Sequence, residues 1–213
     1  MKLNRASFRL YAVTDRAWLN GMTLQEQVTQ AIAGGAGVVQ LREKDLSDRE
    51  FLDEARWFVP LCRRLGAISI INDSVEIALA TNADGVHVGQ EDMAAARARA
   101  ALGPEKIVGV SVHNVEEALA AKAAGADYLG VGAAFASSTK SEAKPISKEL
   151  LRAVTSAVEL PIVAIGGIKE SNILELEACG LDGVAVVSAI FAQADIQAAS
   201  RRMLALAEKI ARR

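Results

Sequence analysis

The chain has 213 residues, which suits one complete α/β barrel and leaves little room for a second domain. Hydrophobic residues make up 51% and aromatic residues only 4%, so we expect a core of Val, Ile, Leu and Ala, as in a parallel sheet covered by helices. The formal net charge of -2 excludes the broad basic surface that nucleic-acid binding needs, and any anion site must be local.

Short runs rich in Val and Ile alternate along the chain with longer segments of helical period, as in repeated βα units. The predicted strands are 9–14, 38–42, 67–71, 85–88, 107–110, 128–132, 161–165 and 183–187. The predicted helices are 23–33, 48–65, 75–80, 93–101, 115–124, 148–157, 169–177 and 196–211. This regular spacing favours an α/β fold in which residues 1–213 form a single (β/α)8 TIM-barrel catalytic domain. An open doubly wound sheet is the alternative.

Polar residues follow the second predicted strand, at the end where barrels carry their functional groups. Strand alternation sends Gln40, Arg42 and Lys44 to one face and Leu41 and Glu43 to the other. Two cations and an amide on one face suit an anionic ligand. The alternative is a solvated strand end with ion pairs to the next helix.

Carboxylates follow the next two strands. Asn72 and Asp73 end the third strand, and Asp92 lies in the loop after the fourth. Two Asp side chains facing two cations would suit a complex of Mg²⁺ with a diphosphate, since this metal takes few protein oxygens. The alternative is helix capping, because Asp73 and Asp92 each precede a helical segment.

Hydroxyl groups mark the fifth and sixth strand ends. Ser111 is predicted to point into the barrel mouth. The loop after the sixth strand contains Ser137, Ser138, Thr139 and Lys140, which together could wrap around an anion. A solvated loop would have a similar composition.

The last two strands end in the pattern of a barrel phosphate site. Gly166 and Gly167 follow the seventh strand, while Val187 and Ser188 end the eighth. Glycine allows the backbone to approach a phosphate closely, and backbone N–H groups can then bind it. These positions predict a phosphate ligand without naming it.

Four residues that often carry chemistry are predicted to be structural here. Cys62 and Cys179 are far apart and have no Cys or His at metal-ligand spacing, so we expect packed thiols. His87 and His113 have no obvious carboxylate partner nearby in sequence, so we expect packed or hydrogen-bonded core residues. The N-terminal segment lacks a signal-peptide pattern and no apolar run could span a bilayer, so we expect a cytoplasmic protein with no membrane partner.

Taken together, these residues resemble the thiamine-phosphate synthase family, from the segment Leu10-Tyr11-Ala12-Val13-Thr14-Asp15 to Val187-Ser188-Ala189-Ile190-Phe191. The resemblance implies a transferase that joins 4-amino-2-methyl-5-(diphosphooxymethyl)pyrimidine to a (carboxy)methylthiazolyl-ethyl phosphate. The products would be thiamine phosphate and pyrophosphate. It further implies Mg²⁺ as cofactor and a reaction in which diphosphate leaves before the thiazole nitrogen attacks. The form of the thiazole stays open, as does assembly into a homo-oligomer.

The resemblance also implies roles for individual residues. Those matching the family's pyrimidine diphosphate site are Gln40, Leu41, Arg42, Glu43, Lys44, Asn72, Ser111 and Lys140. Those matching its thiazole phosphate site are Ser137, Ser138, Thr139, Gly167, Val187 and Ser188. Those matching its Mg²⁺ ligands are Asp73 and Asp92.

The sequence departs from the family pattern at three positions, and two other functions are alternatives. Ala133 and Ala136 stand where the family usually has proline, and Ser74 where it often has a larger residue. A thiazole tautomerase of the same fold is one alternative, but its pattern has a catalytic His at the position of Ala133 and a Cys at that of Thr139. A non-catalytic thiazole-phosphate-binding relative is another, and would be expected to have lost its metal or diphosphate ligands.

Overall fold

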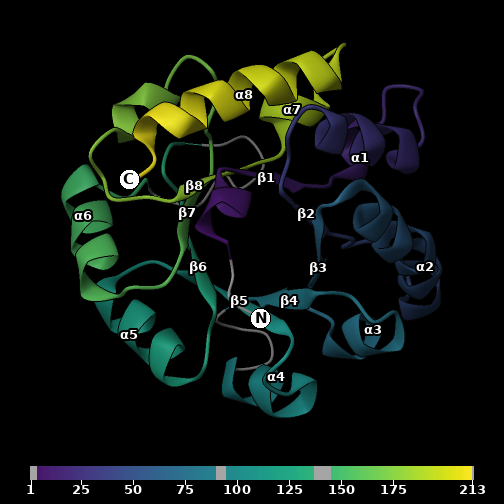
Figure 1. Ribbon diagram of the computed structural model, residues 1–213, viewed down its shortest axis with the longest axis horizontal. Helices are drawn as coiled ribbons and strands as arrows, with labels where there is room; N and C mark the ends of the chain where they lie inside the picture. The colour runs from purple at the N-terminus through teal and green to yellow at the C-terminus, as the bar shows by residue number, and fades with distance from the viewer. Residues whose placement is uncertain (1–3, 90–94, 137–144, 213) are drawn as a thin grey trace.

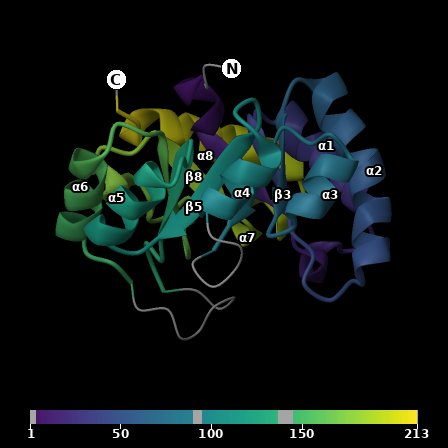
Figure 2. The same cartoon turned by 90° about the horizontal axis from the view of Figure 1, so that it is seen from below.

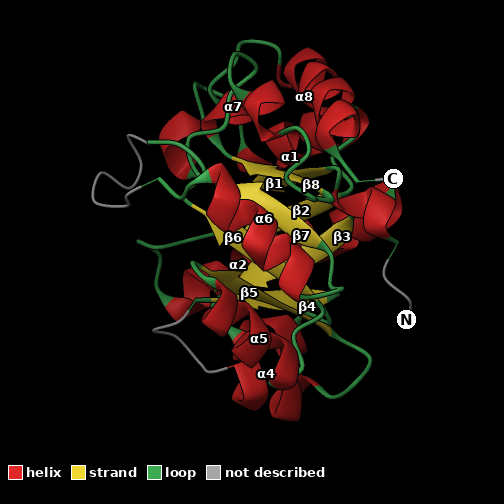
Figure 3. Ribbon diagram, turned by 90° about the vertical axis from the view of Figure 1, so that its left-hand side faces the viewer, coloured by secondary structure: helices red, strands yellow, loops and turns green. Residues whose placement is uncertain are grey.

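Each strand runs parallel to the next, and the last strand pairs with the first, so that β1 to β8 close into a barrel (Figure 1). The computed structural model describes residues 4–89, 95–136 and 145–212. Helices surround the sheet on its outer side (Figure 3). The predicted (β/α)8 TIM barrel is therefore confirmed, and the open doubly wound sheet is excluded.

All eight strands lie where the Val/Ile pattern predicted them. They are β1 Leu10–Val13, β2 Val38–Leu41, β3 Ile68–Asn72, β4 Gly85–Val88, β5 Ile107–Val112, β6 Tyr128–Gly132, β7 Ile162–Ile165 and β8 Gly183–Val186. The described helices are α1 Leu24–Ala33, α2 Asp48–Leu65, α3 Val75–Ala80, α4 Ala95–Leu102, α5 Val115–Ala123, α6 Lys148–Ala157, α7 Ser188–Phe191 and α8 Ile196–Ile210. Three 3-10 turns join them: η1 Arg5–Phe8, η2 Arg16–Trp18 and η3 Ile173–Leu176. Within the described ranges, no helix is both long and apolar enough to cross a membrane.

One predicted helix is wrong. The segment 169–177 contains only the turn η3, and the Asn172 side chain explains why. Its Oδ1 accepts a hydrogen bond from the Lys169 backbone N–H at 2.8 Å, and its Nδ2 donates to the Gly167 carbonyl oxygen at 3.0 Å. Asn thereby offers the backbone an alternative to helical hydrogen bonds. The short helix α7, directly after β8, is not predicted from the sequence.

Side-chain caps fix where the helices begin. Thr23 and Glu26 form a reciprocal capping box at the start of α1, and Ser47 and Glu50 form another at the start of α2. Ser74 caps α3 by accepting a hydrogen bond from the Ile77 N–H at 3.2 Å. Each cap satisfies backbone N–H groups that have no partner within the helix, which is typically worth about 1 kcal/mol.

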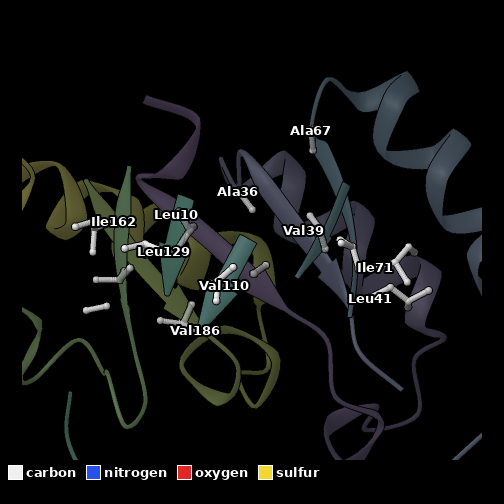
Figure 4. Close-up of a cluster of buried hydrophobic side chains, with 14 of the residues drawn as sticks. Leu10, Ala36, Val39, Leu41, Ala67, Ile71, Val110, Leu129, Ile162 and Val186 are labelled. Carbon is white, nitrogen blue, oxygen red and sulfur yellow. The ribbon is translucent and has the colours of Figure 1, made fainter. Parts of the chain in front are cut away.

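Alternation along the strands creates two apolar layers. One face of each strand packs outward against the helices, and Leu10, Val39, Ile71, Val110 and Leu129 belong to this layer (Figure 4). The other face points toward the barrel axis. This inner layer contains Phe8, Tyr11, Val13, Val38, Ile70, Ile107, Tyr128, Val163 and Ala185. The inner layer closes the floor beneath the residues that project at the carboxyl ends of the strands.

The amino end of the barrel is tied together by one buried carboxylate. Asp182, directly before β8, is 1% exposed and accepts hydrogen bonds from Arg5 Nη1 at 2.9 Å and Arg212 Nη2 at 2.7 Å. It also accepts from the Ile162 N–H at 2.8 Å. Both ends of the described chain are thus held at the same end of the barrel (Figure 2).

Candidate active site

A cavity of about 700 Å³ opens at the carboxyl ends of the strands. Its size is that of a site for a small organic ligand. Residues from seven of the eight strands or their following loops supply charged and polar groups to its lining. These are Asp15, Gln40, Arg42, Lys44, Asn72, His87, Ser111, His113, Lys169 and Ser188.

The side chains at the end of β2 point alternately toward the cavity and away from it, as strand alternation predicts. Gln40, Arg42 and Lys44 line the cavity. Leu41 is fully buried in the outer layer between sheet and helices, and Glu43 lies 2.9 Å from Arg16 Nε. The side chains of Leu41 and Glu43 therefore do not reach the cavity, although both belong to the segment matching the family's pyrimidine diphosphate site.

Glu43 is held in a constrained environment behind that segment. Its side chain is 3% exposed, and its Oε1 has no hydrogen-bond partner in the part of the chain that the structure describes. Burial raises the pKa of the Glu43 carboxyl, although the nearby Arg16 guanidinium acts in the opposite direction. Glu43 and Arg16 together anchor the chain on the far side of Arg42 and Lys44.

Asp73, Lys44 and Asn72 meet at the rim of the cavity. The Asp73 Oδ2 atom accepts hydrogen bonds from Lys44 Nζ and from Asn72 Nδ2, both at 2.5 Å. Because Ser74 caps α3, Asp73 is not the cap of this helix, so the capping alternative is wrong for Asp73. Asp92 lies outside the described residues. No group of three or more His, Cys, Asp or Glu residues in the described ranges forms a ready-made metal site.

The opposite side of the cavity is built from backbone. Gly167 has a φ of +65°, and an added Cβ would lie 2.4 Å from the Ala136 carbonyl oxygen, so that only glycine fits without movement. Gly167, Val187 and Ser188 all line the cavity, and Lys169 brings a cation to the same side. The described part of the loop after β6 ends against this glycine, and Ser137, Ser138, Thr139 and Lys140 lie outside the described residues.

Three residues whose mutual contacts the sequence does not indicate lie deeper in the barrel, and two of them, Tyr11 and His87, line the cavity. Tyr11 and Tyr128 project from β1 and β6, and their hydroxyl oxygens are 2.8 Å apart. His87 bridges Tyr128 and Ser111. Its Nδ1 lies 2.9 Å from the Tyr128 hydroxyl oxygen, and its Nε2 lies 2.9 Å from Ser111 Oγ. The prediction that His87 is a hydrogen-bonded residue of the interior is confirmed. No local sequence pattern indicates this cluster, because its members come from different strands.

The prediction for His113 is wrong. Its side chain is 59% exposed at the cavity rim, and its Nδ1 lies 3.0 Å from Glu117 Oε2. The sequence does not make this carboxylate partner evident, because Glu117 lies four residues further on, in the first turn of α5, and only the fold brings it back to the strand end. Both cysteines are buried, as predicted.

Comparison with known proteins decides the family. The family model described as thiamine monophosphate synthase matches residues 10–190. The thiamine-phosphate synthase of Chloroflexus aurantiacus is 50% identical over 200 residues, which cover 93% of this chain and 92% of that protein. The chain belongs to the thiamine monophosphate synthase family. A second family member, from Ruminiclostridium cellulolyticum, is 46% identical over 94% of this chain and 96% of its own length.

Solved structures agree with membership of the thiamine monophosphate synthase family. The thiamine phosphate pyrophosphorylase from Pyrococcus furiosus superposes with a TM-score of 0.88 at 37% identity, covering 97% of this chain and 98% of its own. A 3-hexulose-6-phosphate synthase superposes with a TM-score of 0.65 at 17% identity, which shows a shared fold alone.

Proposed function

We propose that this chain is a transferase that condenses 4-amino-2-methyl-5-(diphosphooxymethyl)pyrimidine with a thiazolyl-ethyl phosphate, forming thiamine phosphate and releasing pyrophosphate. The observation that carries the proposal is one cavity with groups suited to an anion on two different sides. Arg42 and Lys44 stand on one side, while Gly167, Ser188 and Lys169 stand on the other. Two phosphorylated substrates could therefore lie in the same cavity with their reacting ends toward each other.

Arg42 and Lys44 would bind the diphosphate and compensate the charge that grows on it as it leaves. Such electrostatic stabilisation needs positioned cations rather than a general base. Asn72, beside Lys44 at the same rim, would add an amide hydrogen-bond donor, and Lys140 is proposed to join them. The backbone of Leu41 and Glu43 would hold this strand end in register.

Asp73 and Asp92 are proposed to hold Mg²⁺ on the diphosphate. The donor set fits, because Mg²⁺ usually takes one or two carboxylates and completes its shell with water and phosphate oxygens. Asp73 supports this fit, since its carboxylate lies at the rim beside two donors and is not needed as a helix cap. Bound Mg²⁺ would supply positive charge to the diphosphate oxygens.

The thiazole phosphate is proposed to bind on the other side of the cavity. Gly167 and the Val187–Ser188 backbone would approach it closely, as in the phosphate sites that barrels form after their last two strands. Ser137, Ser138 and Thr139 are proposed to contact the same ligand. The closeness of the described chain at Ala136 to Gly167 supports this, because residue 137 follows directly.

The test supplies both substrates with and without Mg²⁺ and measures pyrophosphate and thiamine phosphate together. We expect both products in equal amounts, with strong dependence on Mg²⁺. Interconversion of thiazole tautomers without the pyrimidine diphosphate, and no pyrophosphate in its presence, would overturn the proposal in favour of a tautomerase. Supplying the carboxylated and decarboxylated thiazole phosphates in separate reactions identifies the preferred acceptor.

A further inference from the structure

A continuous chain of hydrogen bonds crosses the barrel beneath the cavity. Gln40 Nε2 lies 2.7 Å from the Tyr11 hydroxyl oxygen, which lies 2.8 Å from that of Tyr128. Tyr128 is in turn 2.9 Å from His87 Nδ1, and His87 Nε2 is 2.9 Å from Ser111 Oγ. The chain therefore joins Gln40 on β2 to Ser111 on β5 through three residues of β1, β6 and β4.

The barrel is built to accommodate these rings. Tyr11 and Tyr128 are 1% and 0% exposed, and burial raises the pKa of both phenols, so that they stay neutral. A Cβ at Gly109 would lie 2.1 Å from Tyr128 Cζ, and one at Gly130 would lie 3.2 Å from His87 Cε1. Two strands thus carry glycine where the rings need the space.

All hydrogen bonds in this series must point in the same donor-to-acceptor direction, because each hydroxyl group has a single proton to donate. Tyr11 accepts from the Gln40 amide, so its own proton goes to Tyr128. With a neutral imidazole, Tyr128 would then donate to His87 Nδ1, and His87 would carry its proton on Nε2 and donate it to Ser111. The reverse order would leave the buried Tyr11 proton without an acceptor unless the Gln40 amide turned over. An unmade hydrogen bond at such a buried site is costly.

We propose that Tyr11, Tyr128 and His87 are positioning residues that fix the orientation of the Gln40 amide toward the substrate. With its nitrogen held by Tyr11, Gln40 offers the carbonyl oxygen to a ligand in the cavity. A carbonyl oxygen accepts a hydrogen bond from an exocyclic amino group and repels an oxo group at the same place. The ordered chain therefore selects a 4-aminopyrimidine over a 4-oxopyrimidine. This inference rests on the proposed function, because it assigns the pyrimidine to this part of the cavity.

The test compares the wild type with Tyr128→Phe, using the 4-amino pyrimidine diphosphate and its 4-oxo analogue. Phenylalanine keeps the ring and removes the hydroxyl, so Tyr11 can reverse and turn the Gln40 amide over. We expect KM for the amino substrate to rise about tenfold and the preference for amino over oxo to fall about tenfold, with KM for the thiazole phosphate unchanged. Equal changes for both substrates, or an unchanged preference, would overturn the proposal.

Tyr11→Phe and the double variant Tyr11→Phe/Tyr128→Phe supply a second readout. Removing one hydroxyl is enough to interrupt the chain of hydrogen bonds. We therefore expect the preference of the double variant for the amino substrate to be no lower than that of the less selective single variant. Losses that simply add would show two independent structural effects. Thr155→Val is the matched control, since its buried hydroxyl donates to the Cys179 carbonyl oxygen at 2.8 Å on α6, away from the cavity. We expect Thr155→Val to lower Tm and leave the preference unchanged.

Nitrogen NMR of the wild type tests the proton order without any activity measurement. The sequence contains two histidines, so His113→Gln assigns their signals. We expect His87 to be neutral with its proton on Nε2, and a proton on Nδ1 would overturn the proposed order. If the wild type releases no pyrophosphate, the proposed function fails, whereas the NMR result still decides whether the chain is ordered as inferred.

Discussion

Lys44 and Asp73, from the ends of two neighbouring strands, form an ion pair at the rim of the cavity, with Lys44 Nζ 2.5 Å from Asp73 Oδ2. The side chains are 49% and 26% exposed, so the pair is reached by water and contributes little to stability. The pair is important for the proposed function, because it places a cation for the diphosphate beside a carboxylate for Mg²⁺.

Asp73→Asn tests the carboxylate. Asp73 has a φ of +62°, which Asn tolerates as well as Asp does, so the backbone should not change. We expect Tm within about 2 °C of the wild type, which corresponds to less than about 1 kcal/mol, and a loss of more than about 100-fold in pyrophosphate release. The control is Asp53→Asn, which breaks the exposed Asp53–Arg56 pair on α2 and should leave both values unchanged. Lower stability with full turnover would make Asp73 a structural residue.

Lys44→Met should move two affinities in opposite directions. Without the ammonium group, Asp73 keeps Asn72 as a partner and gains room for a metal, so Mn²⁺ used as a probe should bind the substrate-free protein more tightly. The pyrimidine diphosphate should bind more weakly, because one of its cations is gone. Calorimetric titrations of each ligand measure both effects. Weaker Mn²⁺ binding would show that Lys44 orders the carboxylate instead of competing for it.

Arg42→Ala should weaken the binding of one substrate only. The Arg42 backbone N–H donates to Thr14 Oγ1 at 2.9 Å, so the strand end stays anchored when the side chain is removed. We expect an increase of about 10- to 100-fold in Kd for the pyrimidine diphosphate, the value of a hydrogen bond to a charged group, and an unchanged Kd for the thiazole phosphate. Equal weakening of both ligands, with Tm preserved, would contradict the division of the cavity into two sides.

Gly167→Ala should disturb the thiazole side of the cavity. The new Cβ would meet the Ala136 carbonyl oxygen at 2.4 Å, in addition to the cost of a positive φ. Gly66→Ala is the matched control, because Gly66 has a φ of +80° but no atom within 4 Å of an added Cβ. We expect Gly66→Ala to lose about 1 kcal/mol of stability with normal KM values, and Gly167→Ala to raise KM for the thiazole phosphate in addition. Identical behaviour of the two variants would exclude a role for the close approach at Gly167.

Glu43→Gln tests a pH dependence. The pKa of Glu43 is raised in the folded state, so its contribution to stability is present below the unfolded pKa and is lost as pH rises through the folded pKa. Glutamine does not titrate. The Tm of Glu43→Gln should therefore improve relative to the wild type as pH rises from about 4 to about 7. A difference in Tm that stays constant or shrinks would mean that Arg16 outweighs burial.

The sequence predicts the strands well because both faces of each are covered, and covered strands have continuous apolar runs such as Val38-Val39. The polar strand ends are also predictable, since barrels place function there. The Tyr11–Tyr128–His87 chain is not, because its contacts form only when distant strands close around one axis. The helix predicted over 169–177 is wrong because hydrogen bonds of the Asn172 side chain, rather than helix propensity, determine the backbone conformation there. The cytoplasmic location, the homo-oligomer and the Mg²⁺ cofactor stay predictions, as do the binding roles of all the site residues. Among these residues, Asp92, Ser137, Ser138, Thr139 and Lys140 also lie outside the described residues.

The Asp182 cluster has a practical consequence for handling the protein. Arg5 and Arg212 reach the same carboxylate, so the two ends of the described chain are neighbours. They lie at one end of the barrel (Figure 2), whereas the cavity is lined by residues at the carboxyl ends of the strands. A short peptide linker could therefore join them and new ends be opened in a helix connection elsewhere, giving a circular permutant with an undisturbed cavity. By the same geometry, an affinity tag or a surface attachment at either end leaves the substrates' approach to the barrel mouth open.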